Sequence, residues 1–129
     1  MKIAVISGTR RATRKGAAWA WLCEVNPDAV IVGGATGIDT ETRGWARERG
    51  KFVIEVPAPW RPAEPRADGL DYDPEAGMRR NAFMIEVVAV ALRAQGHELL
   101  GGAFPDKQSV GTHDAIRRLR AVGIPTVLP

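Results

Sequence analysis

The sequence predicts an α/β fold, a doubly wound parallel sheet of about five strands, formed by one domain over residues 1–129. Short apolar segments alternate along the chain with longer stretches of helical period, an order typical of right-handed βαβ units. A chain of 129 residues has room for one domain and little more. Hydrophobic residues make up 45% and charged residues 26%, a globular composition that excludes disordered and fibrous proteins.

Five segments are short and mostly apolar, as buried strands are. These predicted strands are 2–7, 29–32, 52–56, 98–104 and 125–128. Four longer segments have helical period or helix end signals, such as Gly50 after the second of them. These predicted helices are 13–24, 38–49, 78–95 and 110–121.

Two of the helices have an apolar face that we expect to be buried. In the first helix this face groups Trp19, Leu22 and Cys23. In the third helix it groups Met78, Ala82, Ile85, Ala89 and Leu92. Cys23 is therefore expected to be a core residue and not a nucleophile.

The loop after the first strand is the first candidate site, because ligands of doubly wound sheets bind at the carboxyl ends of the strands. Its small residues, Ser7, Gly8 and Thr9, allow a ligand to approach the backbone. Four cations lie at or just before the next helix start, where the helix dipole disfavours them. They are Arg10, Arg11, Arg14 and Lys15. A bound phosphate or carboxylate would relieve this conflict; the alternative is that these side chains simply reach solvent.

The loop after the second strand carries three glycines within five positions, between a strand and a helix. They are Gly33, Gly34 and Gly37, followed by Asp39. Such spacing suits a turn whose backbone N–H groups hold a phosphate. The alternative is a tight structural turn with Asp39 as a helix-start acid. The sequence has neither a Walker A motif nor a GxGxxG motif, so a P-loop NTPase is excluded.

The third candidate is the long segment 57–77, with five prolines, Trp60 and Tyr72. A loop of this length is usually a lid, a binding loop or a disordered stretch. It holds five acids against two arginines, so the rest of the chain is more basic than the net charge of +3 indicates. We expect it to be mobile without ligand. Arg79, Arg80 and Asn81 are expected to open the next helix, which again places cations at a positive dipole end.

A fourth polar loop, 104–114, follows the fourth strand. Other features indicate no further chemistry. His97 and His113 lack metal-ligand spacing, so no metal site and no cofactor are predicted. The cations Arg117, Arg118 and Arg120 lie near a helix C-terminus and are interpreted as a solvated face. No membrane segment or signal peptide is evident, and we expect a cytoplasmic protein.

The loops, taken in this order, resemble those of the SLOG superfamily of Rossmann-like domains, and in particular the YspA-like bacterial and phage proteins of uncertain function. The matching residues span nearly the whole chain: Ser7-Gly8-Thr9-Arg10, Gly33-Gly34-Ala35-Thr36-Gly37-Ile38-Asp39, Trp45-Ala46-Arg47-Glu48-Arg49-Gly50, Arg80-Asn81, Phe104-Pro105, Gly111-Thr112, Asp114 and Ala121-Val122-Gly123-Ile124-Pro125.

The resemblance implies strand order 3-2-1-4-5, a crevice between the first and fourth strands, and a nucleotide-like ligand. One branch, the cytokinin-activating phosphoribohydrolases, cleaves the N-glycosidic bond of nucleoside monophosphates, and Arg80 and Asp114 stand at the places of its catalytic residues. Another branch, the DNA-processing protein of transformation, binds single-stranded DNA. The sequence departs from the phosphoribohydrolase motif at Asp106-Lys107, which replace paired glycines.

These observations together predict a domain that binds a nucleotide or related phosphorylated ligand at its strand ends. The predicted ligand-binding residues are Ser7, Gly8, Thr9, Arg10, Gly33, Gly34, Gly37, Asp39, Asn81, Gly111 and Thr112. One alternative is a phosphoribohydrolase that uses Arg80 and Asp114. The other is single-stranded nucleic-acid binding, with Trp60 or Tyr72 stacking on bases. The resemblance also implies a homodimer through helix faces, to which Trp19, Trp21 and Trp45 would contribute.

Overall fold

The computed structural model describes residues 1–11 and 16–129 of the chain. Its sheet has five strands, all parallel, in the order β3-β2-β1-β4-β5, which confirms the predicted fold class and strand order. The strands are β1 (Lys2–Gly8), β2 (Ala29–Val32), β3 (Phe52–Glu55), β4 (Glu98–Phe104) and β5 (Thr126–Val127). The helical elements are α1 (Ala17–Val25), α2 (Ile38–Glu48), α3 (Ala76–Ala82), the π-helix η1 (Phe83–Ala89), α4 (Val90–Ala94) and α5 (Val110–Ala121).

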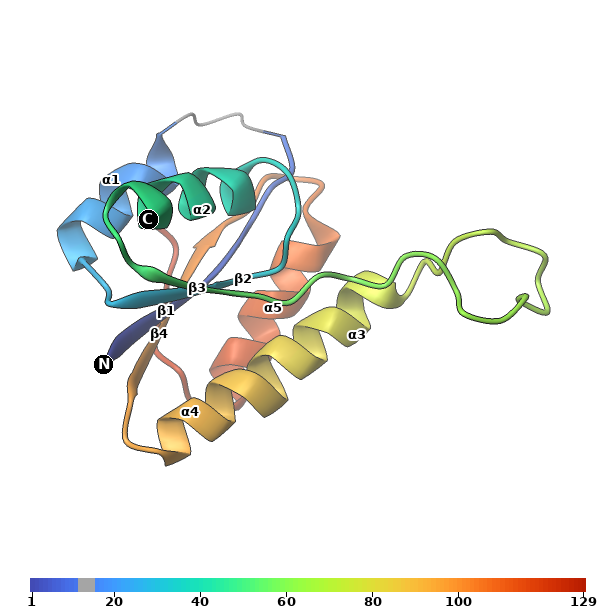
Figure 1. The fold of residues 1–129 in the computed structure, drawn as a ribbon. Coiled ribbons are helices and arrows are strands. Elements are labelled where there is room, and N and C mark those ends of the chain that lie inside the picture. The colour runs from blue at the N-terminus through green and yellow to red at the C-terminus, as the bar shows by residue number, and fades with distance from the viewer. Residues whose placement is uncertain (12–15) are drawn as a thin grey trace.

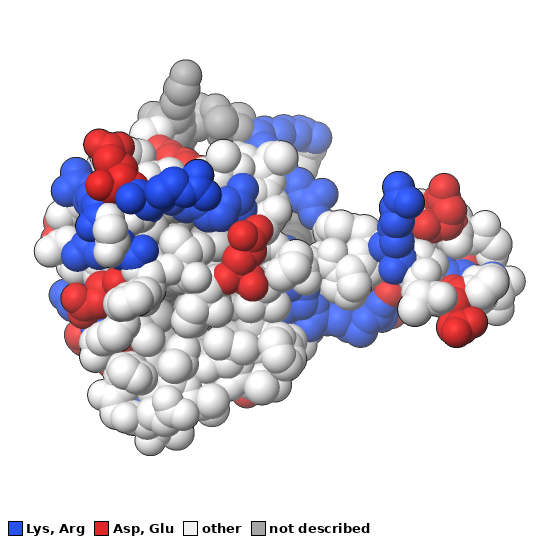
Figure 2. All heavy atoms as spheres, viewed as in Figure 1, with Lys and Arg blue, Asp and Glu red and all other residues white. Residues whose placement is uncertain are grey.

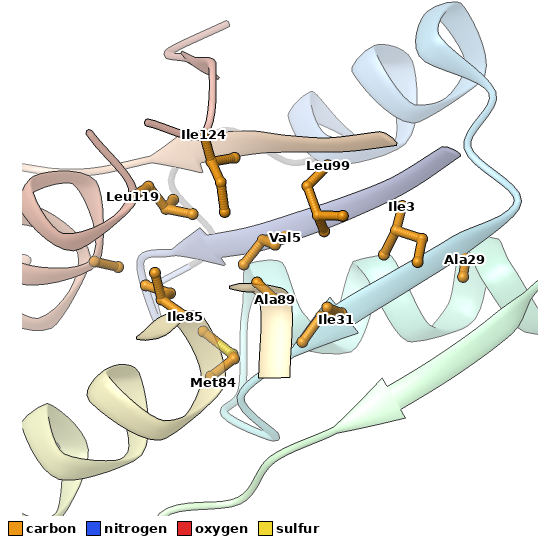
Figure 3. Packing of buried hydrophobic residues seen from close by; sticks show 11 residues of the cluster. Ile3, Val5, Ala29, Ile31, Met84, Ile85, Ala89, Leu99, Leu119 and Ile124 are labelled. Atoms are coloured by element: carbon orange, nitrogen blue, oxygen red, sulfur yellow. The ribbon is translucent and has the colours of Figure 1, made fainter. Parts of the chain in front are cut away.

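Helices cover both faces of the sheet, as a parallel sheet requires (Figure 1). One face packs against η1 and α5, and Figure 3 shows strand residues such as Val5 and Ile31 on the same side as Met84 and Leu119. The other face packs against α1 and α2. Alternate residues of the central strand β1 therefore belong to two separate hydrophobic clusters.

The buried face of α1 differs from the predicted one. Ala18, Trp21 and Leu22 are buried, whereas Cys23 is exposed and Trp19 only partly buried. Gly102 of β4 explains the difference, because a Cβ there would lie 2.5 Å from the ring of Trp21. The missing side chain lets the indole pack against the sheet and fixes the rotation of the helix. The predicted start at residue 13 lies outside the described residues.

Two of the three tryptophans expected to contribute to a dimer surface, Trp21 and Trp45, are buried. Trp45 is 0% exposed and Trp21 is 7% exposed, so both rings belong to the core on the α1 and α2 side. A homodimer that uses their faces would need the core to open.

The long predicted helix forms as one continuous helical run through α3, η1 and α4, but its buried face differs from the predicted one. Ile85 and Ala89 are buried as expected, whereas Met78 is 39% exposed and Met84 takes a core position instead. Two causes account for this. The first turn extends beyond the sheet (Figure 1), and the π-helical turns hold more residues than α-helical ones, which changes the period.

The outer part of the segment between β3 and α3 projects away from the body of the domain (Figure 1). Figure 2 shows basic and acidic side chains mixed on this projection and Lys or Arg side chains near its junction with the body. Among the described residues, no helix is long and apolar enough to cross a bilayer.

Candidate anion site at the strand ends

A cavity of about 320 Å³ lies at the carboxyl ends of β1 and β4, where the predicted crevice was expected. Eight of the predicted site residues line it: Ser7, Gly8, Thr9, Arg10, Asp39, Arg80, Gly111 and Thr112. Six further residues line it that the sequence interpretation did not single out as ligand-binding: Arg11, Ala35, Asp106, Gln108, Ser109 and Val110.

Residues 7–11, at the end of β1 and just after it, form one wall through close backbone packing. A Cβ on Gly8 would lie 2.5 Å from the Ile38 side chain, so the glycine allows the start of α2 to approach the end of β1. The Thr9 hydroxyl donates to Asp106 Oδ2 at 2.5 Å and accepts the Arg11 N–H at 3.0 Å. Thr9 therefore holds two loops together with a hydroxyl that is already engaged.

Asp106 organises the opposite loop, between β4 and α5. Its Oδ1 accepts the Gln108 N–H at 2.8 Å and the Ser109 hydroxyl at 2.7 Å. The hydrogen bond from Thr9, and then that from Ser109, lower the pKa of the Asp106 carboxyl to about 2. A fixed negative charge thus borders the cavity. The Asp-x-x-Ser spacing before a predicted helix was the available signal for this turn.

The N-terminus of α5 opens into the cavity. This helix has 12 residues and no side-chain cap, because the Ser109 hydroxyl is used by Asp106. Among the described residues, nothing accepts the N–H groups of Gly111 and Thr112. A Cβ on Gly111 would meet open space. Two free backbone donors at the positive end of a helix dipole form a good anion-binding element.

The glycines of the β2–α2 loop lie outside the cavity lining and serve the fold. A Cβ on Gly33 would overlap the Arg80 guanidinium, and one on Gly34 would lie 2.7 Å from the Glu55 carboxylate. Gly37 has φ +73° and packs against the Thr9 carbonyl. Their spacing reflects close contacts with neighbouring elements, which is the structural-turn alternative stated above.

Asp39 lines the cavity and is 5% exposed. Its Oδ2 accepts the Ala35 N–H at 3.1 Å, which braces its own loop. Burial raises the pKa of the Asp39 carboxyl, and the Ala35 hydrogen bond and the charge of Arg80 oppose the rise. Asp39 and Arg80 therefore balance one another's charge at the inner side of the cavity.

Arg80 is the fifth residue of α3, because the helix begins at Ala76 and not at Met78. The expectation that Arg80 lies at a helix N-terminus is therefore wrong. Its guanidinium donates to the carbonyl of Gly33 and, at 3.0 Å through Nε, to Asn81 Oδ1. Burial lowers the pKa of Arg80, and the charge of Asp39 opposes this. Much of its hydrogen-bonding capacity is used within the protein.

Arg10 and Arg11 differ from Arg80 in their hydrogen bonding. Both side chains are exposed, both residues line the cavity, and neither guanidinium donates a hydrogen bond to a residue that the structure describes. The Arg10 Cζ lies 4.9 Å from the ring centroid of Trp60. The predicted cations Arg14 and Lys15 lie outside the described residues.

Asn81 and Asp114 lie behind the cavity wall. Asn81 Nδ2 donates to the Gly111 carbonyl at 3.0 Å and to Asp114 Oδ2 at 3.1 Å, while Arg118 Nε donates to the same Oδ2 at 2.9 Å. Arg118 also pairs with Glu86, so it belongs to an ion-pair network and not to a simple solvated face. These contacts tie α3 to α5, and they leave Asp114 outside the cavity lining.

The structure groups no metal-binding set of three His, Cys, Asp or Glu side chains within residues 1–11 and 16–129.

No family model matches the chain, and no curated protein matches it in sequence. Among solved structures, the fold is similar to that of DNA processing protein A (DprA) from Streptococcus pneumoniae, with a TM-score of 0.50 and 17% sequence identity. The match covers 98% of this chain but 58% of the DprA chain, so this chain spans little more than half the length of that protein. The likeness supports the Rossmann-like α/β fold.

Proposed function

We propose that this protein is a SLOG-type domain that binds a nucleotide or nucleotide-derived phosphorylated ligand in the cavity at its strand ends. One observation carries the proposal: the uncapped start of α5 lines the same cavity as Arg10 and Arg11, whose guanidinium groups donate no hydrogen bond to a residue that the structure describes. Free backbone donors and free guanidinium donors together are the chemistry that binds phosphate.

In this proposal the phosphate binds at Gly111 and Thr112 and is neutralised by Arg10 and Arg11. Asp106, with its pKa held at about 2, adds a negative charge to the lining beside Thr9 and Ser109, and the charge of Arg11 acts on it, so the two arginines offset this carboxylate as well as the phosphate. The Ser7 hydroxyl and the Asp39 carboxylate, both in the cavity lining, would contact the polar groups of the remainder of the ligand. A cavity of about 320 Å³ is at the small end of the range usual for ligand pockets, roughly 300–1,000 Å³.

A thermal-shift screen of mono-, di- and cyclic nucleotides tests this function. A ligand present at about 100 times its Kd stabilises the folded state by roughly 2.7 kcal/mol. Arg10→Ala should weaken binding of the best phosphorylated ligand by about 1.5–3 kcal/mol, because a charge-assisted hydrogen bond is lost. Binding of the matching unphosphorylated nucleoside should be unaffected. Absence of any stabilisation across the panel would refute nucleotide binding.

Arg10 and Arg80 also offer a test of a shared anion. Both line the cavity, and the charge of Arg10 lowers the pKa of Arg80, so the two cations act on one another. If both contact one phosphate, the double alanine variant should lose less affinity than the sum of the single losses. Additive losses would place them on separate groups of the ligand.

Single-stranded nucleic acid is the second candidate, because Arg10 and the partly exposed Trp60 lie together beside the cavity. The DprA structure, whose fold is similar, is that of a DNA processing protein, which also favours this candidate. A basic surface with an aromatic ring suits a single strand. Affinity that appears with long oligonucleotides, not mononucleotides, and falls steeply with added salt would favour this candidate.

Phosphoribohydrolase activity remains a prediction with less support. Arg80 lines the cavity, but Asp114 is engaged by Asn81 and Arg118 and does not line it. A general acid or base must reach the reacting atoms directly or through one water. Release of free base from a nucleoside monophosphate by the purified protein would establish the activity.

A further inference from the structure

The contact between Arg10 and Trp60 links the cavity to the projecting segment 57–77. With the Arg10 Cζ 4.9 Å from the ring centroid, the pair lies within the range of a cation–π interaction. Such a contact uses the face of the ring and the charge of the guanidinium, and it consumes no N–H donor. Arg10 is therefore held beside the cavity while its donors stay available for a ligand.

Arg80, in the same cavity lining, is held by hydrogen bonds instead of by an aromatic ring. Its guanidinium is fixed by hydrogen bonds to the Gly33 carbonyl and to Asn81 Oδ1, so those N–H groups are no longer free. Arg10 makes no such bond to the described residues. Of the two arginines, Arg10 is the one whose orientation depends on an aromatic ring.

Trp60 is itself fixed at the base of the segment. Its carbonyl accepts the Asp73 N–H at 2.6 Å, and Asp73, 6% exposed, forms ion pairs with Arg79 of α3 and with Arg66 at 3.3 Å. The Cη2 atom of Trp60 lies 3.1 Å from the position of a Cβ on Gly77. The indole is thus attached to the start of α3, while the outer part of the segment projects into solvent (Figure 1).

We infer that Trp60 is a positioning residue for the anion site: its ring holds the Arg10 guanidinium beside the start of α5. The inference rests on the proposed function, and it makes the base of segment 57–77 a part of the site. The loss of the ring would leave a flexible, solvated arginine that must be ordered again each time an anion binds, and this ordering costs conformational entropy.

The test compares Trp60→Leu, which removes the ring, with Trp60→Phe, which keeps an aromatic face. Tyr72→Leu is the matched control, since it removes an exposed aromatic side chain from the same segment. Titration calorimetry measures the Kd of the nucleotide that stabilises the wild type most, of its unphosphorylated nucleoside, and of inorganic phosphate. NMR of the Arg10 Nε–Hε group reports the ring contact without any ligand, through the ring-current shift.

Trp60→Leu should weaken binding of the phosphorylated ligand roughly 3- to 10-fold, leave nucleoside binding unchanged and abolish the ring-current shift. Trp60→Phe should restore most of the affinity, and Tyr72→Leu should change neither readout. In an Arg10→Ala background, Trp60→Leu should have no further effect, because the ring acts through the guanidinium.

Wild-type affinity in Trp60→Leu, or an equal loss with and without Arg10, would overturn the positioning role while leaving nucleotide binding intact. No binding of any phosphorylated probe to a wild-type protein that shows the ring-current shift would overturn the proposed function, and the positioning role with it.

Discussion

Gly111 provides a sharp test of the anion site, because the protein contains a matched control. Gly111 in the first turn of α5 and Gly44 inside α2 are both helical glycines, neither has positive φ, and a Cβ on either would meet open space. Both therefore accept alanine without a clash. Gly111 lines the cavity, whereas Gly44 does not.

Alanine should stabilise the folded state at both positions. The gain at an interior helix position is about 0.5–1 kcal/mol, because alanine loses less backbone entropy than glycine on folding. For a domain of this size that corresponds to a Tm increase of roughly 2–5 °C for Gly44→Ala. Gly111→Ala should gain less, since the first turn of a helix depends less on propensity.

Ligand affinity should fall in Gly111→Ala and stay unchanged in Gly44→Ala. A methyl group on Gly111 would stand in the space from which an anion reaches the free N–H groups at the start of α5. The loss of one charge-assisted hydrogen bond corresponds to about 1.5–3 kcal/mol, or roughly 10- to 150-fold in Kd. Titration calorimetry with the best ligand of the nucleotide screen, beside circular dichroism melting curves, measures both effects. Wild-type affinity in a well-folded Gly111→Ala variant would refute phosphate binding at this helix start.

Three other outcomes follow from the geometry. The folded-state pKa of Asp106 lies below its unfolded value, so its contribution to stability should be present above about pH 4 and lost as the pH falls towards 2; Asp106→Asn should flatten this part of a pH–stability curve measured by urea unfolding. Asp114→Ala should destabilise the protein by about 1–3 kcal/mol in urea, because buried partners between α3 and α5 lose their acceptor; an unchanged midpoint would contradict the tie. In hydrogen exchange, amides of 61–72 should exchange quickly and that of Asp73 slowly, since the latter is bonded to a carbonyl; uniform protection would count against a mobile segment.

The alternation of apolar strands and helices was sufficient to predict the fold class and nearly all element positions. Those patterns depend on local composition, and the parallel βαβ connection leaves few topologies. The strand order came from the SLOG resemblance. Burial patterns were harder to predict: Trp21 faces the sheet because Gly102 lies opposite, and that contact joins residues 81 positions apart in the chain.

Only part of the candidate site was predicted, again because contacts between residues far apart in the chain cannot be read from local patterns. Strand-end rules located Thr9, Arg10 and Gly111 correctly in one cavity. The same rules gave the glycine loop a ligand role, whereas in the structure Gly33 lies against Arg80 of α3 and Gly37 against the Thr9 carbonyl. Asp106 was noted only as a departure from a family motif, and its hydrogen bond to Thr9 joins residues that are 97 positions apart in the chain. Sequence spacing cannot reveal which donors a folded neighbour has already engaged.

The π-helical segment η1 packs in the core and directly follows α3, the helix that carries Arg80 of the cavity lining. Its turns hold more residues than α-helical turns, so the length of Phe83–Ala89 sets the rotation of α3 relative to α4. Met84 and Ala89 anchor this region in the core. A change in the length of η1 would therefore be felt at Arg80, which lines the cavity, and at Asn81, which ties α3 to α5. A single-residue deletion here would disturb the core packing of Met84 and Ala89 and the position of Arg80 together, without the substitution of any residue of the site.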